Sequence, residues 1–112
     1  MKQQVRLIRE VPYESERKYS AVFFEKDGTG HVAATGAVET ILDFCSGMVR
    51  DGKPADLDRE GIDATAQTLA EKGLRVLAVA SGETGPTQHE IPLGKEALSG
   101  MVLHGLAGFV DP

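Results

Sequence analysis

Residues 19–42, YSAVFFEKDGTGHVAATGAVETIL, hold the clearest local signals of the fold. Two apolar runs rich in β-forming residues, 19–25 and 31–35, flank the turn sequence KDGTG. Asp-Gly between two such runs favours a β-hairpin. Apolar residues then recur at three- and four-residue spacing over 38–45, which is typical of one helical face. The stretch therefore predicts a β-hairpin followed directly by a helix.

The junction between the second strand and this helix, Thr35-Gly36-Ala37, is a candidate ligand site. Backbone N–H groups and the dipole at a helix start favour an anion. Yet residues 31–42 contain no lysine, no arginine and no second glycine. A phosphate site and a simple tight turn both fit this pattern.

The segments on either side of this stretch suggest further strands and a turn. Val5, Leu7 and Val11 alternate with charged residues, as in a half-buried strand that Pro12 ends. After the helix, Gly47 is a plausible stop, and residues 50–54 (RDGKP) predict a turn.

A second helix is expected between Asp56 and Gly73. The carboxylates of residues 56–60 favour a helix start, and Gly73 fits a left-handed C-terminal cap. The expected apolar face consists of Ile62, Ala66, Leu69 and Ala70.

The C-terminal third of the chain predicts two more strands. Residues 74–80 (LRVLAVA) read as a central strand, 81–95 as a polar loop, and 101–110 as a last strand interrupted by Gly105 and Gly108. This order predicts an α/β (α+β) fold with a largely antiparallel sheet and flanking helices.

Composition limits the classes of function. A chain of 112 residues fits one domain, and a net charge of -5 argues against a nucleic-acid surface. A small anion could still bind where a few basic residues converge. No run of eighteen apolar residues occurs and Cys45 is the only cysteine, so we expect a soluble chain in a reducing, cytoplasmic setting without direct membrane contact.

Generic catalytic motifs are weak. The three histidines lack metal-ligand spacing, and Cys45 reads as a small core residue. The glycine-rich stretch 81–86 lacks the lysine of a phosphate-binding loop, and no pair of nucleophile and base is visible. The histidines are His31, His89 and His104, and the carboxylates that read as helix-start residues are Asp56, Asp58 and Glu60.

Three places point to a nucleotide when taken together: residues 12–20 (PYESERKYS), residues 35–37, and Arg75 entering an apolar strand. An unpaired guanidinium near a core costs several kcal/mol, so Arg75 in a buried strand would need an anionic partner. A turn, a cap and a snorkelling arginine would explain the three separately. An aromatic ring, a lysine, a backbone junction and an arginine together suit a nucleotide.

At these residues the sequence resembles the nucleotide-binding (N) domain of P-type cation-transporting ATPases. Four landmarks match in order and cover almost the whole chain: VPYESERKYSAV (11–22), TGAVETIL (35–42), GLRVLAVA (73–80) and LHGLAGFVDP (103–112). The Gly-Ala-Val-Glu form and the spacer RDGKPADLD are more similar to the magnesium- and calcium-type pumps than to the heavy-metal branch.

The resemblance implies a set of contacts to ATP, with Mg²⁺ carried by the nucleotide. Tyr13 would stack on adenine, Ser20 and Leu77 would line the base pocket, and Lys18 and Arg75 would lie near the nucleotide and its phosphates. The backbone at the junction would approach the ligand closely. The implied residues are Tyr13, Lys18, Ser20, Thr35, Gly36, Ala37, Arg75 and Leu77.

Thr35 departs from the family pattern, which has a lysine at this position. Loss of that cation would weaken binding about ten- to a hundredfold, or 1–3 kcal/mol, the range for charge-assisted hydrogen bonds. The family's acidic adenine contact and its phosphorylated aspartate are also absent.

We therefore expect residues 1–112 to be a single N domain, excised and N-terminally trimmed from a larger pump. It would present the γ-phosphate to the aspartate of a phosphorylation domain, beside a membrane domain, and hydrolyse nothing alone. The alternative is a non-enzymatic interaction module that keeps this scaffold with weak or lost affinity for ATP and ADP.

Overall fold

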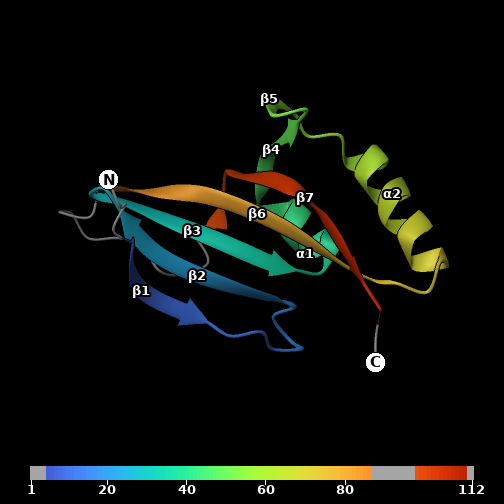
Figure 1. The fold of residues 1–112 in the computed structure, drawn as a ribbon, viewed down its shortest axis with the longest axis horizontal. Coiled ribbons are helices and arrows are strands. Elements are labelled where there is room, and N and C mark those ends of the chain that lie inside the picture. Colours follow the sequence, from blue (N-terminus) through green and yellow to red (C-terminus); the bar gives the residue numbers. More distant parts are fainter. Residues whose placement is uncertain (1–4, 87–97, 111–112) are drawn as a thin grey trace.

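The computed structural model describes residues 5–86 and 98–110, which form one sheet with two helices (Figure 1). The strand order is β1-β2-β3-β6-β7-β4-β5, and every neighbouring pair is antiparallel except β4 and β7. The mixed fold with a largely antiparallel sheet is therefore confirmed. The strands are β1 (Val5–Val11), β2 (Tyr19–Lys26), β3 (Thr29–Gly36), β4 (Cys45–Arg50), β5 (Lys53–Asp56), β6 (Arg75–Pro86) and β7 (Met101–Phe109), and the helices are α1 (Val38–Phe44) and α2 (Arg59–Glu71).

The predicted β2–β3 hairpin is present, and a second hairpin repeats its turn chemistry. Asp27 and Gly28 adopt φ angles of 53° and 78° between β2 and β3. Asp51 and Gly52 adopt 53° and 75° between β4 and β5. Two successive left-handed residues match the twist of a two-residue hairpin. The sequence predicted only a turn at residues 50–54, because the short flanks of the second turn lack the apolar alternation of a strand.

The first helix is shorter than predicted. α1 ends at Phe44, and Cys45 begins β4 instead of continuing the helix to Gly47. β4 lies parallel to β7, with Cys45 opposite Met101. This pairing between segments far apart in sequence overrides the helical spacing of Cys45.

The central strand β6 is longer than predicted. The expected loop 81–95 is wrong for residues 81–86, which pair with the first half of β3 up to the pair Thr29↔Pro86. Residues 87–95 lie outside the described part of the chain. The polar, glycine-rich sequence SGETG forms a strand because β3 supplies backbone partners beside it, with one bulge at Thr84.

One face of the sheet carries the core, and we call it the covered face. α1 lies behind the centre of the sheet in Figure 1 and contacts β3, β6 and β7, while α2 contacts β6, β7 and α1. Among the described residues every buried side chain is apolar. Those side chains are Ala21, Phe23, Val32, Ala34, Ile41, Leu42, Phe44, Ile62, Ala78, Ala80, Leu98, Met101 and Leu103.

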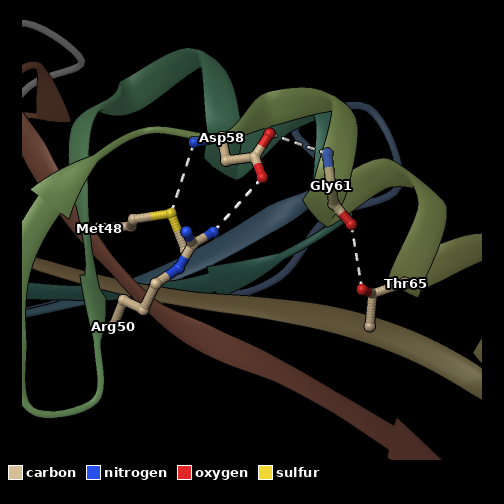
Figure 2. Close-up of polar contacts among 5 residues, drawn as sticks. All are labelled: Met48, Arg50, Asp58, Gly61 and Thr65. Atoms are coloured by element: carbon tan, nitrogen blue, oxygen red, sulfur yellow. Dashed lines mark hydrogen bonds and ion pairs between the residues drawn. The ribbon is translucent and has the colours of Figure 1, made fainter.

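α2 is anchored at its first turn, as Figure 2 shows. Asp58 Oδ1 accepts a hydrogen bond of 3.1 Å from the Gly61 N–H, and Asp58 Oδ2 lies 3.3 Å from a nitrogen of Arg50. The Asp58 N–H donates to Met48 Sδ at 3.4 Å. The helix-start role predicted for Asp58 is confirmed. At the other end, Gly73 has the predicted left-handed φ of 83°.

Two predicted burial patterns are only partly confirmed. In α2, Ile62 is buried and Leu69 half-buried, but Ala70 faces solvent. In β1, Val5 and Leu7 are 59% and 55% exposed, whereas Ile8 and Val11 pack against the core. A bulge between Leu7 and Arg9 shifts the register of β1, so simple alternation selected the wrong side chains in its first half.

Candidate functional site

A cavity of about 540 Å³ lies at the end of the sheet where β3 ends and β6 begins. Its volume falls within the usual range for small-ligand sites, about 300–1,000 Å³. Six of the eight residues implied by the family resemblance line it. The described lining residues are Tyr13, Ser20, Thr35, Gly36, Arg75, Leu77, Phe109 and Val110.

Strand alternation places most of this lining on the face opposite the core, which we call the open face. Thr35 and Leu77 are half-buried, while their chain neighbours Ala34 and Ala78 are fully buried on the covered face. Ser20 lies opposite Thr35, and its Oγ donates a long hydrogen bond of 3.5 Å to the Thr35 carbonyl. Three adjacent strands thus contribute side chains to one wall.

The turn between β1 and β2 presents Tyr13, which is 47% exposed. The Lys18 N–H donates to the Glu14 carbonyl at 2.7 Å, and the Arg17 guanidinium donates to the Pro12 carbonyl. Arg17 also lies 3.6 Å from the Glu14 carboxylate. These bonds close the turn on both sides of Tyr13. Arg17, to which the sequence analysis gave no role, thus holds the turn that carries Tyr13.

Arg75 is the charged residue among the described lining of the cavity. It is exposed at the first position of β6, so the expected desolvation of a buried guanidinium is wrong. In the sheet, Arg75 is paired with Phe109 of β7. Within residues 5–86 and 98–110 its guanidinium has no ion-pair or hydrogen-bond partner, which leaves it available to an anion at the cavity.

The strand-to-helix junction, read from the sequence as either an anion site or a tight turn, is held by internal contacts. The Ala37 N–H donates to the Lys18 carbonyl at 3.0 Å. A Cβ on Gly36 would lie 2.7 Å from Tyr19 Cα and still closer to the Lys18 carbonyl oxygen. Gly36 is therefore required first by the close approach of β3 to β2. α1 has only seven residues and no side-chain cap at its start.

Two implied contact residues are absent from the described lining of this cavity. Lys18 instead lines a separate cavity of about 500 Å³ next to α1, with Asp43 and Phe44 among its other walls. Ala37 is half-buried beside the junction. Lys18 has a left-handed φ of 66°, which belongs to the turn geometry described above.

Phe109 and Val110 line the cavity but were not singled out from the sequence. Phe109 is 49% exposed and faces Arg75 across the β6–β7 ladder. The segment was interpreted as the end of an apolar strand and as a family landmark, and no ligand contact was assigned to it. Its relation to Arg75 follows from the register of β6 and β7, which the sequence alone did not provide.

The other chemical candidates among the described residues are Cys45 and the pair Ser81–His104. Burial raises the pKa of the Cys45 thiol to about 11, partly offset by Arg59, so this thiol is a poor nucleophile. Ser81 Oγ and His104 Nε2 are hydrogen-bonded at 2.6 Å, a pair that sequence reasoning missed. Neither has a further side-chain partner in the described chain, so no third group orients the imidazole. His89 lies outside that part.

Residues 5–86 and 98–110 hold no group of three or more His, Cys, Asp or Glu side chains suited to a metal ion. Neither helix in the same residues has the length and apolar character needed to cross a membrane.

Comparison with known proteins identifies the family. The family model described as P-type ATPase, cytoplasmic domain N, matches residues 1–112. The cation-transporting ATPase pma1 of Synechocystis sp. is 35% identical over 103 residues, covering 91% of this chain and 11% of that protein. The probable cation-transporting ATPase F of Mycobacterium tuberculosis is 37% identical over 108 residues, covering 94% of this chain and 12% of that protein.

A third relative is eukaryotic. The sodium/potassium exporting P-type ATPase cta3 of Schizosaccharomyces pombe is 40% identical over 107 residues, covering 94% of this chain and 10% of that protein. The chain thus spans about a tenth of the length of these relatives. Since the family match covers the whole chain and the relatives cover more than nine tenths of it, this chain belongs to the P-type ATPase cytoplasmic N-domain family.

Proposed function

We propose that the open-face cavity binds ATP and that the chain serves as the nucleotide-binding domain of a cation pump. The observation that carries this proposal is the convergence of six implied contact residues on one cavity of about 540 Å³. They come from a turn and three strands that are separated in sequence. Membership of the N-domain family and relatives named as cation-transporting ATPases support the same function.

In this proposal an apolar part of the cavity contacts the base of the nucleotide, and a charged part contacts its phosphates. Tyr13 offers a ring face to adenine, and Leu77 and the backbone at Gly36 form the wall behind the base. The Arg75 guanidinium, which has no partner among residues 5–86 and 98–110, donates charge-assisted hydrogen bonds to the phosphates. Mg²⁺ arrives with the polyphosphate.

The contribution of this domain to phosphoryl transfer is positioning. Transfer of the γ-phosphate to an aspartate depends on alignment and charge neutralisation, and this chain supplies the alignment. The phosphorylation and membrane domains of a longer parent pump would supply the aspartate and the ion path. The chain alone is expected to hydrolyse no ATP. Assignment to the magnesium- or calcium-type branch rests on the Gly-Ala-Val-Glu form and the spacer RDGKPADLD.

The proposal is tested by titrating the isotope-labelled chain with ATP and with ADP, and by following its amide signals. Shifts centred on Tyr13, Gly36, Arg75 and Leu77, with little change in α2, are the expected result. A titration that stays flat up to millimolar nucleotide rejects binding by this chain and favours the interaction module. Shifts centred on the Lys18 cavity would place the nucleotide elsewhere.

Thr35→Lys provides a gain-of-function test, since Thr35 lines the cavity. The added ammonium should raise ATP affinity about ten- to a hundredfold. Thr29→Lys is the matched control, because Thr29 lies on the same face at the far end of β3 and gains the same charge. No gain from Thr35→Lys, or an equal gain from both variants, would mean that the end of β3 is not beside the phosphates.

A further inference from the structure

We infer that Phe109 contacts the nucleotide base, forming a second aromatic wall of the cavity across from the turn that carries Tyr13. This inference rests on the proposed function. Tyr13 and Phe109 both line the cavity, one from the β1–β2 turn and one from the end of β7. They are separated by 96 positions in the sequence, so only the fold brings them to one site.

Both rings keep surface for a ligand. Tyr13 is 47% exposed and Phe109 is 49% exposed. The ring contacts of the described residues join Tyr19 to Phe44 and Phe24 to His31, so neither cavity ring is stacked on another ring. A half-exposed phenylalanine has no polar tip to solvate, and covering it with a planar base removes apolar surface from water.

The position of Phe109 relative to Arg75 fits a ligand with both a base and phosphates. The two residues are directly paired in the β6–β7 ladder, and both line the cavity. Phe109 and Arg75 therefore lie where the base of the nucleotide joins its charged part, with the ring beside the base and the guanidinium beside the phosphates. The ring at residue 109 favours a planar base, and its removal should weaken binding even though no charge or hydrogen bond is lost.

The test compares ATP affinity in three variants of the 112-residue chain. Phe109→Leu removes the ring and keeps an apolar side chain, and should weaken ATP binding about three- to tenfold, the range for an aromatic contact. Phe109→Tyr keeps the ring and should stay within about twofold of the parent chain. Phe24→Leu is the matched control, since Phe24 stacks on His31 and is not part of the cavity lining.

The outcomes separate this inference from the proposed function. If the parent chain binds no ATP, both the proposed function and the inference are rejected. If the parent binds and Phe109→Leu behaves like Phe24→Leu, the role of Phe109 is rejected while nucleotide binding stands. Equal losses in Phe109→Leu and Phe109→Tyr would also reject it, because the ring would then not be the determinant. A loss confined to Phe109→Leu supports the aromatic wall.

Discussion

The two faces of the sheet differ in how their side chains are used. On the covered face, Phe23, Ile41 and Met101 are no more than 1% exposed, and every buried side chain in the described residues is apolar. On the open face, the cavity combines two half-exposed rings with the guanidinium of Arg75, which has no partner in the part of the chain that the structure describes. The contrast indicates that one face supplies the free energy of folding, while the other keeps groups available for a ligand.

The two faces meet at the end of β3. Gly36 is buried, contacts the Lys18–Tyr19 backbone and still lines the cavity. The same close approach that fixes the β2–β3 pair thus shapes the floor of the site. Substitutions on the covered face should therefore change stability, and those on the open face should change ligand binding. Substitutions at Gly36, the seam between the two faces, should change both.

The largest effect is expected on the covered face. Phe23→Ala removes a ring that is 1% exposed and should lower the free energy of unfolding by about 3–5 kcal/mol. Urea denaturation followed by circular dichroism measures the loss. Val22→Ala is the control, because Val22 precedes Phe23 in the same strand and faces outward. It should lower the free energy of unfolding far less. Equal losses would contradict the division between the faces.

A smaller effect is expected at the seam. Gly36→Ala places a Cβ 2.7 Å from Tyr19 Cα, so β2 and β3 must separate, at a cost of about 1–3 kcal/mol. Gly82→Ala is the matched control in β6, where the nearest atom to the new Cβ is Met101 Cγ at an ordinary 3.5 Å. The free energies of unfolding of the two variants provide the comparison. An unchanged Gly36→Ala variant would remove the steric reason for this glycine.

The pH dependence of stability tests the burial of Cys45. Burial raises its folded pKa to about 11 from an ordinary value of 9.0, so between these pH values the folded chain keeps a proton that the unfolded chain loses. This contribution is complete below pH 9 and disappears as the pH rises through 11, with an upper limit of about 2–3 kcal/mol because the thiol is only half-buried. The difference in unfolding free energy between the parent and Cys45→Ala should narrow or reverse over that interval. A constant difference would mean that the thiol is well solvated.

The cap of α2 should contribute about 1 kcal/mol. Asp58→Ala removes the acceptor of the Gly61 N–H and should lower stability by about 0.5–2 kcal/mol in urea denaturation. Asp58→Asn keeps a capping side chain but removes the charge facing Arg50, and should retain most of that stability. If both variants lose equally, the ion pair and not the cap is the stabilising contact.

The sequence predicted those parts of the fold whose determinants are local. The Asp27-Gly28 turn, the Asp58 cap and the Gly73 stop each depend on the conformational preference of one or two residues. β4, and the half of β6 beyond Ala80, depend instead on strands that lie far away in the sequence, so periodicity could not reveal them. The bulge in β1 also shifts which side chains face the core, so simple alternation of apolar and charged residues did not predict their burial.

The candidate site shows the same limit. The family resemblance pointed to Tyr13, Thr35 and Arg75, and the fold brings them to one cavity. Phe109 was missed because its place there follows from pairing with Arg75. Lys18 was expected at the same site, but the left-handed turn places it along the lining of the other cavity.

Arg75 gives the smallest expected change in stability and the sharpest contrast with Phe23. Its guanidinium is exposed and has no partner in the described chain, so Arg75→Ala should change the free energy of unfolding by no more than about 0.5 kcal/mol. ATP affinity should nevertheless fall about tenfold, because a charge-assisted contact to phosphate is lost. Arg9→Ala, an exposed arginine on β1, is the matched control for the removed charge. Calorimetric titration of both variants with ATP decides the question, since equal affinities in the two would mean that Arg75 does not meet the phosphates.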